Sequence, residues 1–131
     1  MNPLTKTIAF IGAGNMGEAL IRGLLDRQTV TPSQIVAADI SEERLEYFEG
    51  KFGIRVTTDN AQATGVAEIV LLAVKPQQMS DVLARLKPRP SALIISIAAG
   101  ISTGRIEREL GNRPHVIRAM PNTPALVGAG A

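Results

Sequence analysis

Residues 8–25 read IAFIGAGNMGEALIRGLL, and this stretch decides the fold. An apolar run passes into three glycines, Gly12, Gly14 and Gly17, and continues as an amphipathic pattern. The spacing GxGxxG between a strand and a helix is typical of a turn that holds the phosphates of a dinucleotide. In such a turn Gly12 would permit the tight bend, Gly14 would let backbone approach a pyrophosphate, and Gly17 would let the helix pack against the strand.

The alternative is a strand–helix turn that merely needs small residues. The surrounding strand and helix patterns favour a phosphate site, because a helix N-terminus offers free N–H groups and a partial positive charge. We therefore predict cofactor contacts along the whole loop, which comprises Gly12, Ala13, Gly14, Asn15, Met16 and Gly17.

The rest of the chain alternates apolar runs with helical patterns. Strands are expected at residues 6–11, 34–38, 54–57, 69–74, 92–97 and 115–119. Residues 69–74 show no polar alternation, which predicts a strand buried on both faces. The first helix is expected to bury the face formed by Met16, Ala19, Leu20, Gly23 and Leu24. Strands separated by helices predict a single α/β domain with a doubly wound parallel sheet of the Rossmann type.

Composition excludes several classes of function. The chain has 131 residues, a net charge of +2 and no cysteine, so disulfides, thiolate metal sites and cysteine nucleophiles are absent. No basic block is interleaved with aromatic residues, which argues against nucleic-acid binding by stacking. The apolar runs are far shorter than the ~20 residues of a spanning helix, and the N-terminus makes a poor signal peptide, so we expect no membrane association and a cytoplasmic location. His115, the single histidine, begins an expected strand away from the ligand edge, and no metal-ligand set can be assembled.

Asp39 ends the second expected strand, where an acidic residue can hold a ribose 2′-hydroxyl. This position favours NADH, because a carboxylate repels the 2′-phosphate of NADPH. Arg44 lies close enough in sequence to act as a counter-charge to that phosphate. Asp39 could also be a simple turn residue before Ser41, and the choice between NADPH and NADH stays open.

Three later strand ends carry further candidates, because ligands bind at the carboxyl ends of parallel strands. Lys75 precedes Pro76, which holds it extended, although a solvated lysine is an equal alternative. Residues 98–100 are small enough for a flat ring to lie against the backbone, unless they only lead into a helix. Residues 120–124 form a stiff loop that presents Asn122 and Thr123, or serve as a plain connection.

Four segments together resemble pyrroline-5-carboxylate reductase in its amino-terminal half. They are FIGAGNMG at residues 10–17, LAVKP at 72–76, SIAAGIS at 96–102 and VIRAMPNTPALVGAG at 116–130. They occur in order through essentially the whole chain, and the last is far more specific than GxGxxG.

The resemblance implies reduction of 1-pyrroline-5-carboxylate to L-proline by NADPH or NADH, the last step of proline biosynthesis. It implies cofactor contacts from Gly12–Gly17, Asp39, Asn60, Ala73, Val74, Lys75, Pro76, Ala98, Ala99 and Gly100. It also makes Lys75 a candidate catalytic residue at the nicotinamide end, with Asn122 and Thr123 near the reacting ring.

Two departures from the family pattern qualify that implication. Many relatives carry a small polar residue where Asp39 stands, which bears on cofactor preference. The family also has a helical domain that forms the dimer and supplies most of the imino-acid pocket, and we expect that domain to be absent here. Residues 1–124 would be the cofactor domain, and residues 125–131 the start of the connection to the helical domain. We expect this chain to bind cofactor but turn over substrate poorly, and to form a homo-oligomer only with the helical domain. The alternatives are a non-catalytic redox-sensing module and another imine or carbonyl reductase.

Overall fold

Six parallel strands form one sheet in the computed structural model, which describes residues 5–111 and 114–119. The strands are β1 (Ile8–Ile11), β2 (Ile35–Ala38), β3 (Arg55–Thr57), β4 (Ile69–Leu72), β5 (Leu93–Ser96) and β6 (His115–Arg118). Their order is β3-β2-β1-β4-β5-β6, and all five pairings are parallel. The order reverses between β1 and β4, as in doubly wound sheets. The predicted fold class is confirmed.

Helices connect the strands. They are α1 (Asn15–Asp26), α2 (Glu42–Phe52), α3 (Asn60–Gly65), α4 (Met79–Leu83) and α5 (Thr103–Leu110), with 3₁₀ turns η1 (Pro32–Gln34) and η2 (Pro76–Gln78). Local signals explain several boundaries. Ser41 and Ser102 cap α2 and α5 through their hydroxyl oxygens, and Gly53 ends α2 at φ +68°.

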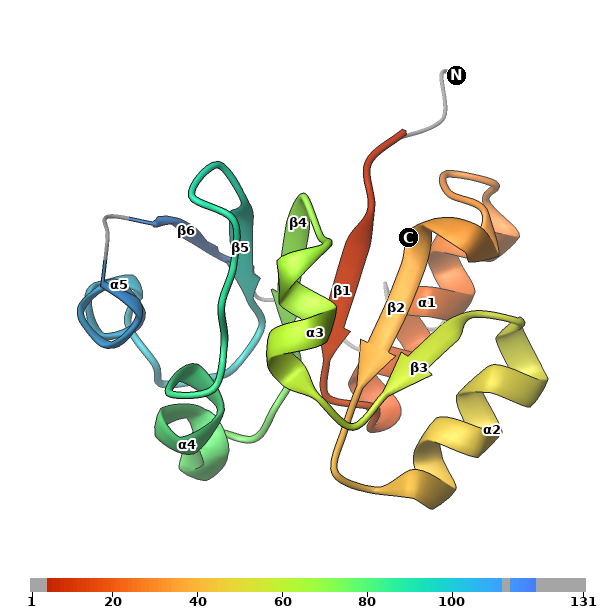
Figure 1. Cartoon of the computed structure of the whole chain (residues 1–131), viewed down its shortest axis with the longest axis horizontal. Coiled ribbons are helices and arrows are strands. Elements are labelled where there is room, and N and C mark those ends of the chain that lie inside the picture. The colour runs from red at the N-terminus through yellow and green to blue at the C-terminus, as the bar shows by residue number, and fades with distance from the viewer. Residues whose placement is uncertain (1–4, 112–113, 120–131) are drawn as a thin grey trace.

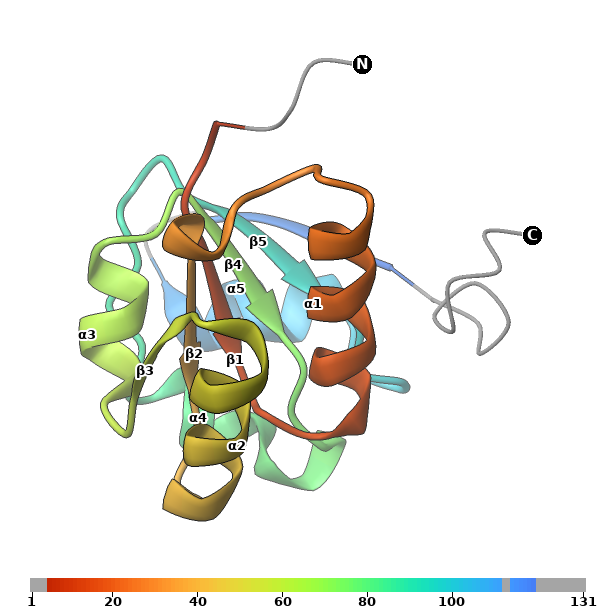
Figure 2. The same ribbon diagram turned by 90° about the vertical axis from the view of Figure 1, so that its right-hand side faces the viewer.

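The helices form a layer on each side of the sheet. Ile21 of α1 and Phe48 of α2 pack with Phe10 in one buried cluster, whereas Met79 of α4 and Ile106 of α5 pack with Val70 in the other. Figure 2 shows α1 and α3 on opposite sides of the sheet. Helix α3 connects β3 to β4 and packs on β1 and β2, which lie between them, so the chain crosses to the other half of the sheet at β4 (Figure 1).

The expectation that residues 69–74 are buried on both faces is wrong. Burial alternates along β4, where Val70 and Leu72 are buried and Ile69 and Leu71 are only partly so. The same alternation runs through β5. The face that α3, α4 and α5 cover is closed, while the opposite face of β4 and β5 is only partly covered by the described residues.

The buried face of α1 is partly as expected, because Leu20 and Leu24 pack against the cluster that contains Phe10, but its fully buried residues differ. Gly17 and Ile21 are its buried residues, and Met16 is 38% exposed. The helix takes this rotation because Gly17 lies directly against the Gly12 carbonyl, where a Cβ atom would sit 2.9 Å from the oxygen. Contact with the preceding loop therefore determines which face of α1 turns toward the sheet.

Candidate functional site

The loop from β1 to α1 needs glycine at two positions for internal reasons. Gly12 has φ +109°, and a Cβ atom there would lie 2.6 Å from the Ala73 carbonyl oxygen. Gly17 has the close contact with Gly12 described above. These two glycines therefore let the loop fold tightly against the end of β4.

Gly14 differs, because no described atom lies within 4 Å of the position its Cβ would take. Its φ of −88° is also ordinary for any residue. Gly14 is the N-cap of α1 and has no side chain that could accept from the first N–H groups of the helix. By contrast, the side chains of Ser41, Asp59 and Ser102 accept such hydrogen bonds at the starts of α2, α3 and α5. The start of α1 thus combines open space with N–H groups that lack a side-chain acceptor, which is the arrangement that an anion requires.

Ala13 anchors the glycine loop through both of its backbone polar groups. It is completely buried, and its N–H donates to Asp39 Oδ2 at 2.7 Å. Its carbonyl oxygen accepts from Arg44 Nε, also at 2.7 Å. Asp39 Oδ1 accepts from the Ser41 N–H at 2.9 Å, so the carboxylate joins the loop to the start of α2.

Arg44 in turn belongs to a network between α1 and α2. Its Nη2 donates to Glu18 Oε1 at 3.1 Å, while Arg22 Nη2 and the Tyr47 hydroxyl donate to Glu18 Oε2. These donors, Tyr47 first, lower the pKa of Glu18 despite partial burial that opposes the shift. Glu18 is thus a charged acceptor that holds α1 against α2.

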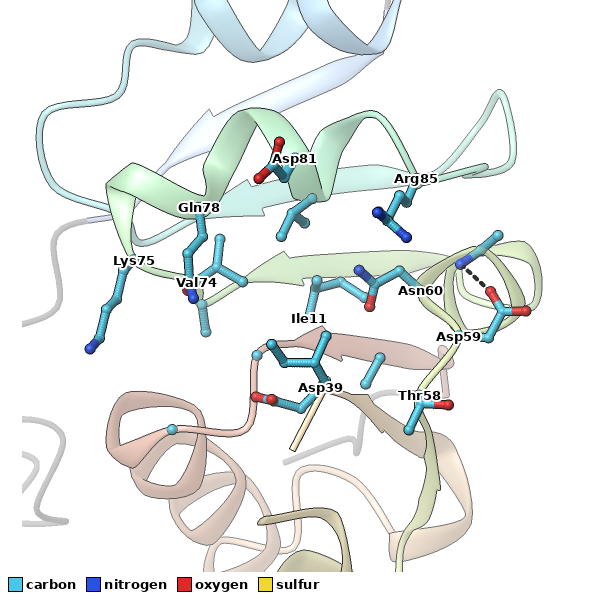
Figure 3. A pocket seen from close by; sticks show the side chains of 17 residues that line it. Ile11, Asp39, Thr58, Asp59, Asn60, Val74, Lys75, Gln78, Asp81 and Arg85 are labelled. Carbon is cyan, nitrogen blue, oxygen red and sulfur yellow. Dashed lines mark hydrogen bonds between the residues drawn. The ribbon is translucent and has the colours of Figure 1, made fainter. Parts of the chain in front are cut away.

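A cavity of about 850 Å³ opens beside the glycine loop, at the carboxyl ends of β1, β2 and β4. Gly12, Gly14 and Asp39 line it on one side, and the turn before α3 supplies Asp59 and Asn60. The segment carrying Gln78, Asp81 and Arg85 lies across the cavity from Asp39, with Lys75 at one end (Figure 3). The volume lies within the usual range for small-molecule sites.

Several lining residues escaped the sequence analysis. They are Ile11, Ala38, Ile40, Thr58, Asp59, Ala61, Gln78, Asp81, Val82 and Arg85. The spacing of Gln78, Asp81 and Val82 would have signalled a common helical face. Ile40 follows Asp39 and is 85% exposed, an unusual state for a large apolar side chain, and a ligand ring against it would bury that surface.

The residues predicted for the site divide into three groups. Those that line the cavity are Gly12, Gly14, Asp39, Asn60, Ala73, Val74 and Lys75. The others described lie beside it or elsewhere, namely Ala13, Asn15, Met16, Gly17, Arg44, Pro76, Ala98, Ala99 and Gly100. Asn122 and Thr123 fall outside the described residues, as does the expected connection at 125–131.

Lys75 has the extended backbone expected before Pro76, with φ −68° and ψ +147°, and its side chain is exposed. Residues 98–100 follow β5, where Ala98 is buried and Gly100 has φ +76°. His115 is exposed at the amino end of β6, away from the cavity. Within the described residues there is no His, Asp and Glu cluster that could hold a metal ion, and the helices are too short or too polar to span a bilayer.

Comparisons with known proteins agree with this geometry. The family described as "NADP oxidoreductase coenzyme F420-dependent" matches residues 7–100. Pyrroline-5-carboxylate reductase of Pseudomonas aeruginosa is 48% identical over 129 residues, which cover 97% of this chain and 47% of the relative. The chain therefore spans about half the length of the curated relatives it matches.

Solved structures give the same result. A pyrroline-5-carboxylate reductase from Coxiella burnetii superposes with a TM-score of 0.86 at 38% identity, covering 95% of this chain and 47% of the other. The Plasmodium falciparum pyrroline carboxylate reductase, solved with NADP bound, has a TM-score of 0.82 at 28% identity and covers 97% of this chain and 46% of the other. The resemblance seen in the four sequence segments is confirmed.

Proposed function

Because this chain belongs to the family described as "NADP oxidoreductase coenzyme F420-dependent", we propose that its cavity binds NADPH or NADH. We further propose that the chain supplies the cofactor half of a pyrroline-5-carboxylate reductase, which reduces 1-pyrroline-5-carboxylate to L-proline. The observation that carries the proposal is the open space at Gly14, beside the uncapped start of α1 and the Asp39 carboxylate.

The donor and acceptor groups fit the two polar parts of such a cofactor. The first N–H groups of α1 would bind the pyrophosphate, which needs donors and no side chain in the way. A carboxylate has about four acceptor positions. Asp39 uses one on Ala13 and one on Ser41, so two remain for ribose hydroxyls.

The bound cofactor would supply a hydride from its reduced nicotinamide to the C=N carbon of the cyclic imine in its protonated form, so that the nitrogen takes the π electron pair and is left as the neutral amine. The chain's own contribution is to hold the cofactor so that this carbon and the hydride meet in reactive geometry. Lys75, exposed at one end of the cavity, places an ammonium group beside the carboxyl end of β4. We retain Lys75, Asn122 and Thr123 as candidates for the reacting end.

A pair of glycine variants tests cofactor binding without disturbing the fold. Gly14→Ala places a methyl group in open space at an ordinary φ, so the variant should unfold like the wild type. Its affinity for NADH and NADPH, followed by nicotinamide fluorescence, should fall about tenfold or more, because that methyl group occupies the pyrophosphate position.

Gly50→Ala is the matched control, since it makes the same change in α2 with no described atom within 4 Å. It should leave binding unchanged. Equal binding by both variants would refute the phosphate site. Binding without rapid consumption of NADH or NADPH when 1-pyrroline-5-carboxylate is added is the expected result, because this chain spans about half the length of its reductase relatives.

A further inference from the structure

We propose that Arg44 positions the phosphate-binding loop through the Ala13 carbonyl and is not the receptor for a 2′-phosphate. This inference rests on the proposed function. Its first support is that Ala13 is held on both sides, with its N–H on Asp39 and its carbonyl oxygen on Arg44, each at 2.7 Å. Ala13 lies between Gly12 and Gly14, so these two bonds fix the segment that would carry the pyrophosphate.

The second support is that the Arg44 side chain is itself fixed. Nε and Nη2 are engaged by Ala13 and Glu18, and the guanidinium lies 5.0 Å from the ring centre of Tyr47 and 5.2 Å from that of Phe48. Its backbone N–H donates to the Ser41 hydroxyl oxygen at 3.2 Å. Reaching into the cavity would break two charge-assisted hydrogen bonds and uncover both rings.

The third support is the charge at the start of α2. Arg44 is not among the residues that line the cavity, whereas Asp39 is. Glu42 and Glu43 occupy the first turn of α2, next to Asp39. A 2′-phosphate in this region would meet carboxylates, and the Arg44 guanidinium is committed to the loop and to Glu18. Arg44 should therefore support NADH and NADPH binding equally.

The guanidinium has two separable properties, a donor at the Nε position and a positive charge. Arg44→Met keeps the aliphatic stem on the rings but removes both. Arg44→Gln restores a donor at the same distance along the side chain and leaves the charge out. A loop-positioning residue needs the donor, while a phosphate receptor needs the charge.

We would measure the Kd of NADH and of NADPH for the wild type and both variants. Arg44→Met should raise the Kd of NADH and the Kd of NADPH by the same factor, about tenfold. Arg44→Gln should recover most of that loss for both. Arg22→Met is the matched control, because Arg22 also binds Glu18 but does not contact Ala13, and it should change either Kd by less than about twofold. Selective loss of NADPH binding in Arg44→Met, with no recovery in Arg44→Gln, would overturn the inference.

A spectroscopic measurement separates loop positioning from a general structural role. The Gly14 N–H shares a peptide plane with the Ala13 carbonyl, so its ¹⁵N shift in the ligand-free protein reports on the Arg44 bond. Arg44→Met should move the Gly14 signal, and Arg44→Gln should return it toward the wild type. An unmoved signal would refute the proposed bond.

If Arg44→Met does not fold, Glu18→Gln weakens the hold on Arg44 and should shift the same signal and reduce both affinities equally. If the wild type binds neither cofactor, the proposed function fails, yet the Gly14 signal still decides whether Arg44 positions the loop.

Discussion

The interior strands β1 and β2 and the edge strand β6 belong to one sheet but differ in how they are covered. Every residue of β1 and β2 is buried, whereas three of the four residues of β6 are exposed. On the face toward α1 and α2, the register aligns Ile8 with Ile35, and Ile95 with Ile117. Ile35 is 0% exposed and Ile117 is 47% exposed, although both side chains lie on the same face of one sheet.

This difference shows that an apolar run predicts a strand but not its surroundings. The fully buried strands β1 and β2 carry the glycine loop, Asp39 and the Arg44 network. A loop that must hold an anion in a defined position benefits from attachment to the most tightly packed strands. None of the residues of β5 or β6 lines the cavity.

The largest test of this comparison is a matched pair of core truncations. Ile35→Ala should lower the free energy of unfolding by about 2–5 kcal/mol, because it removes a fully buried side chain and leaves a cavity. Ile117→Ala should cost less than about 1 kcal/mol, because much of that side chain already contacts water. Urea unfolding of both variants measures the difference, and equal costs would mean that β2 and β6 are covered alike in solution.

Gly12→Ala should have the next largest effect, because it strikes the point where the loop meets β4. We expect a loss of about 2–3 kcal/mol in unfolding free energy from the positive φ and the 2.6 Å approach to the Ala73 carbonyl. Cofactor affinity should fall as well, since the loop must move away from its position. Gly14→Ala provides the contrast, with weakened binding and unchanged stability, so a stable Gly12→Ala variant would contradict the described turn.

The sequence predicted the features that depend on local geometry. Gly12 and Asp39 were placed correctly, because a tight turn requires positive φ and the carboxyl ends of neighbouring parallel strands meet at one edge. The cap at Ser41 and the αL residue at Gly53 likewise follow from short-range rules.

What could not be predicted depends on how helices are rotated and packed. Arg44 was expected to face a phosphate, but its position depends on Glu18, which is 26 residues away in sequence and on another helix. The cavity-lining role of Arg85 required the placement of α4 against the cavity. The partial exposure of Leu71 required knowledge of which face each helix covers.

A smaller test compares the two serine caps, Ser41 at the start of α2 and Ser102 at the start of α5. Ser41 accepts from the Arg44 N–H at 3.2 Å, and Ser102 accepts from the Arg105 N–H at 3.1 Å. Because a cap acts locally, Ser41→Ala and Ser102→Ala should each cost about 1 kcal/mol, regardless of strand coverage. Thermal unfolding of both variants checks this, and a much larger cost at Ser41 would show that the Arg44 network depends on the cap.

The smallest expected effect concerns the acid stability contributed by one carboxylate on α1 and one on α5. The pKa of Glu18 lies below its ordinary value of 4.5, chiefly through the Tyr47 hydroxyl, and that of Glu109 is lowered chiefly by Arg105. A carboxylate with a lowered pKa in the folded state adds stability above its ordinary pKa, and this stability is lost as the pH falls through the folded-state pKa.

Glu18→Gln should therefore destabilise the protein by about 1 kcal/mol at neutral pH and progressively less below pH 4.5. Glu109→Gln should follow the same course with only about 0.3 kcal/mol, because its i,i+4 pair is more exposed, at 31% against 14% for Glu18. Urea unfolding across this pH range compares the two variants. A Glu18 effect that persists unchanged in acid would mean that glutamine loses packing contacts rather than charge, and the α1–α2 network would then hold the loop by shape alone.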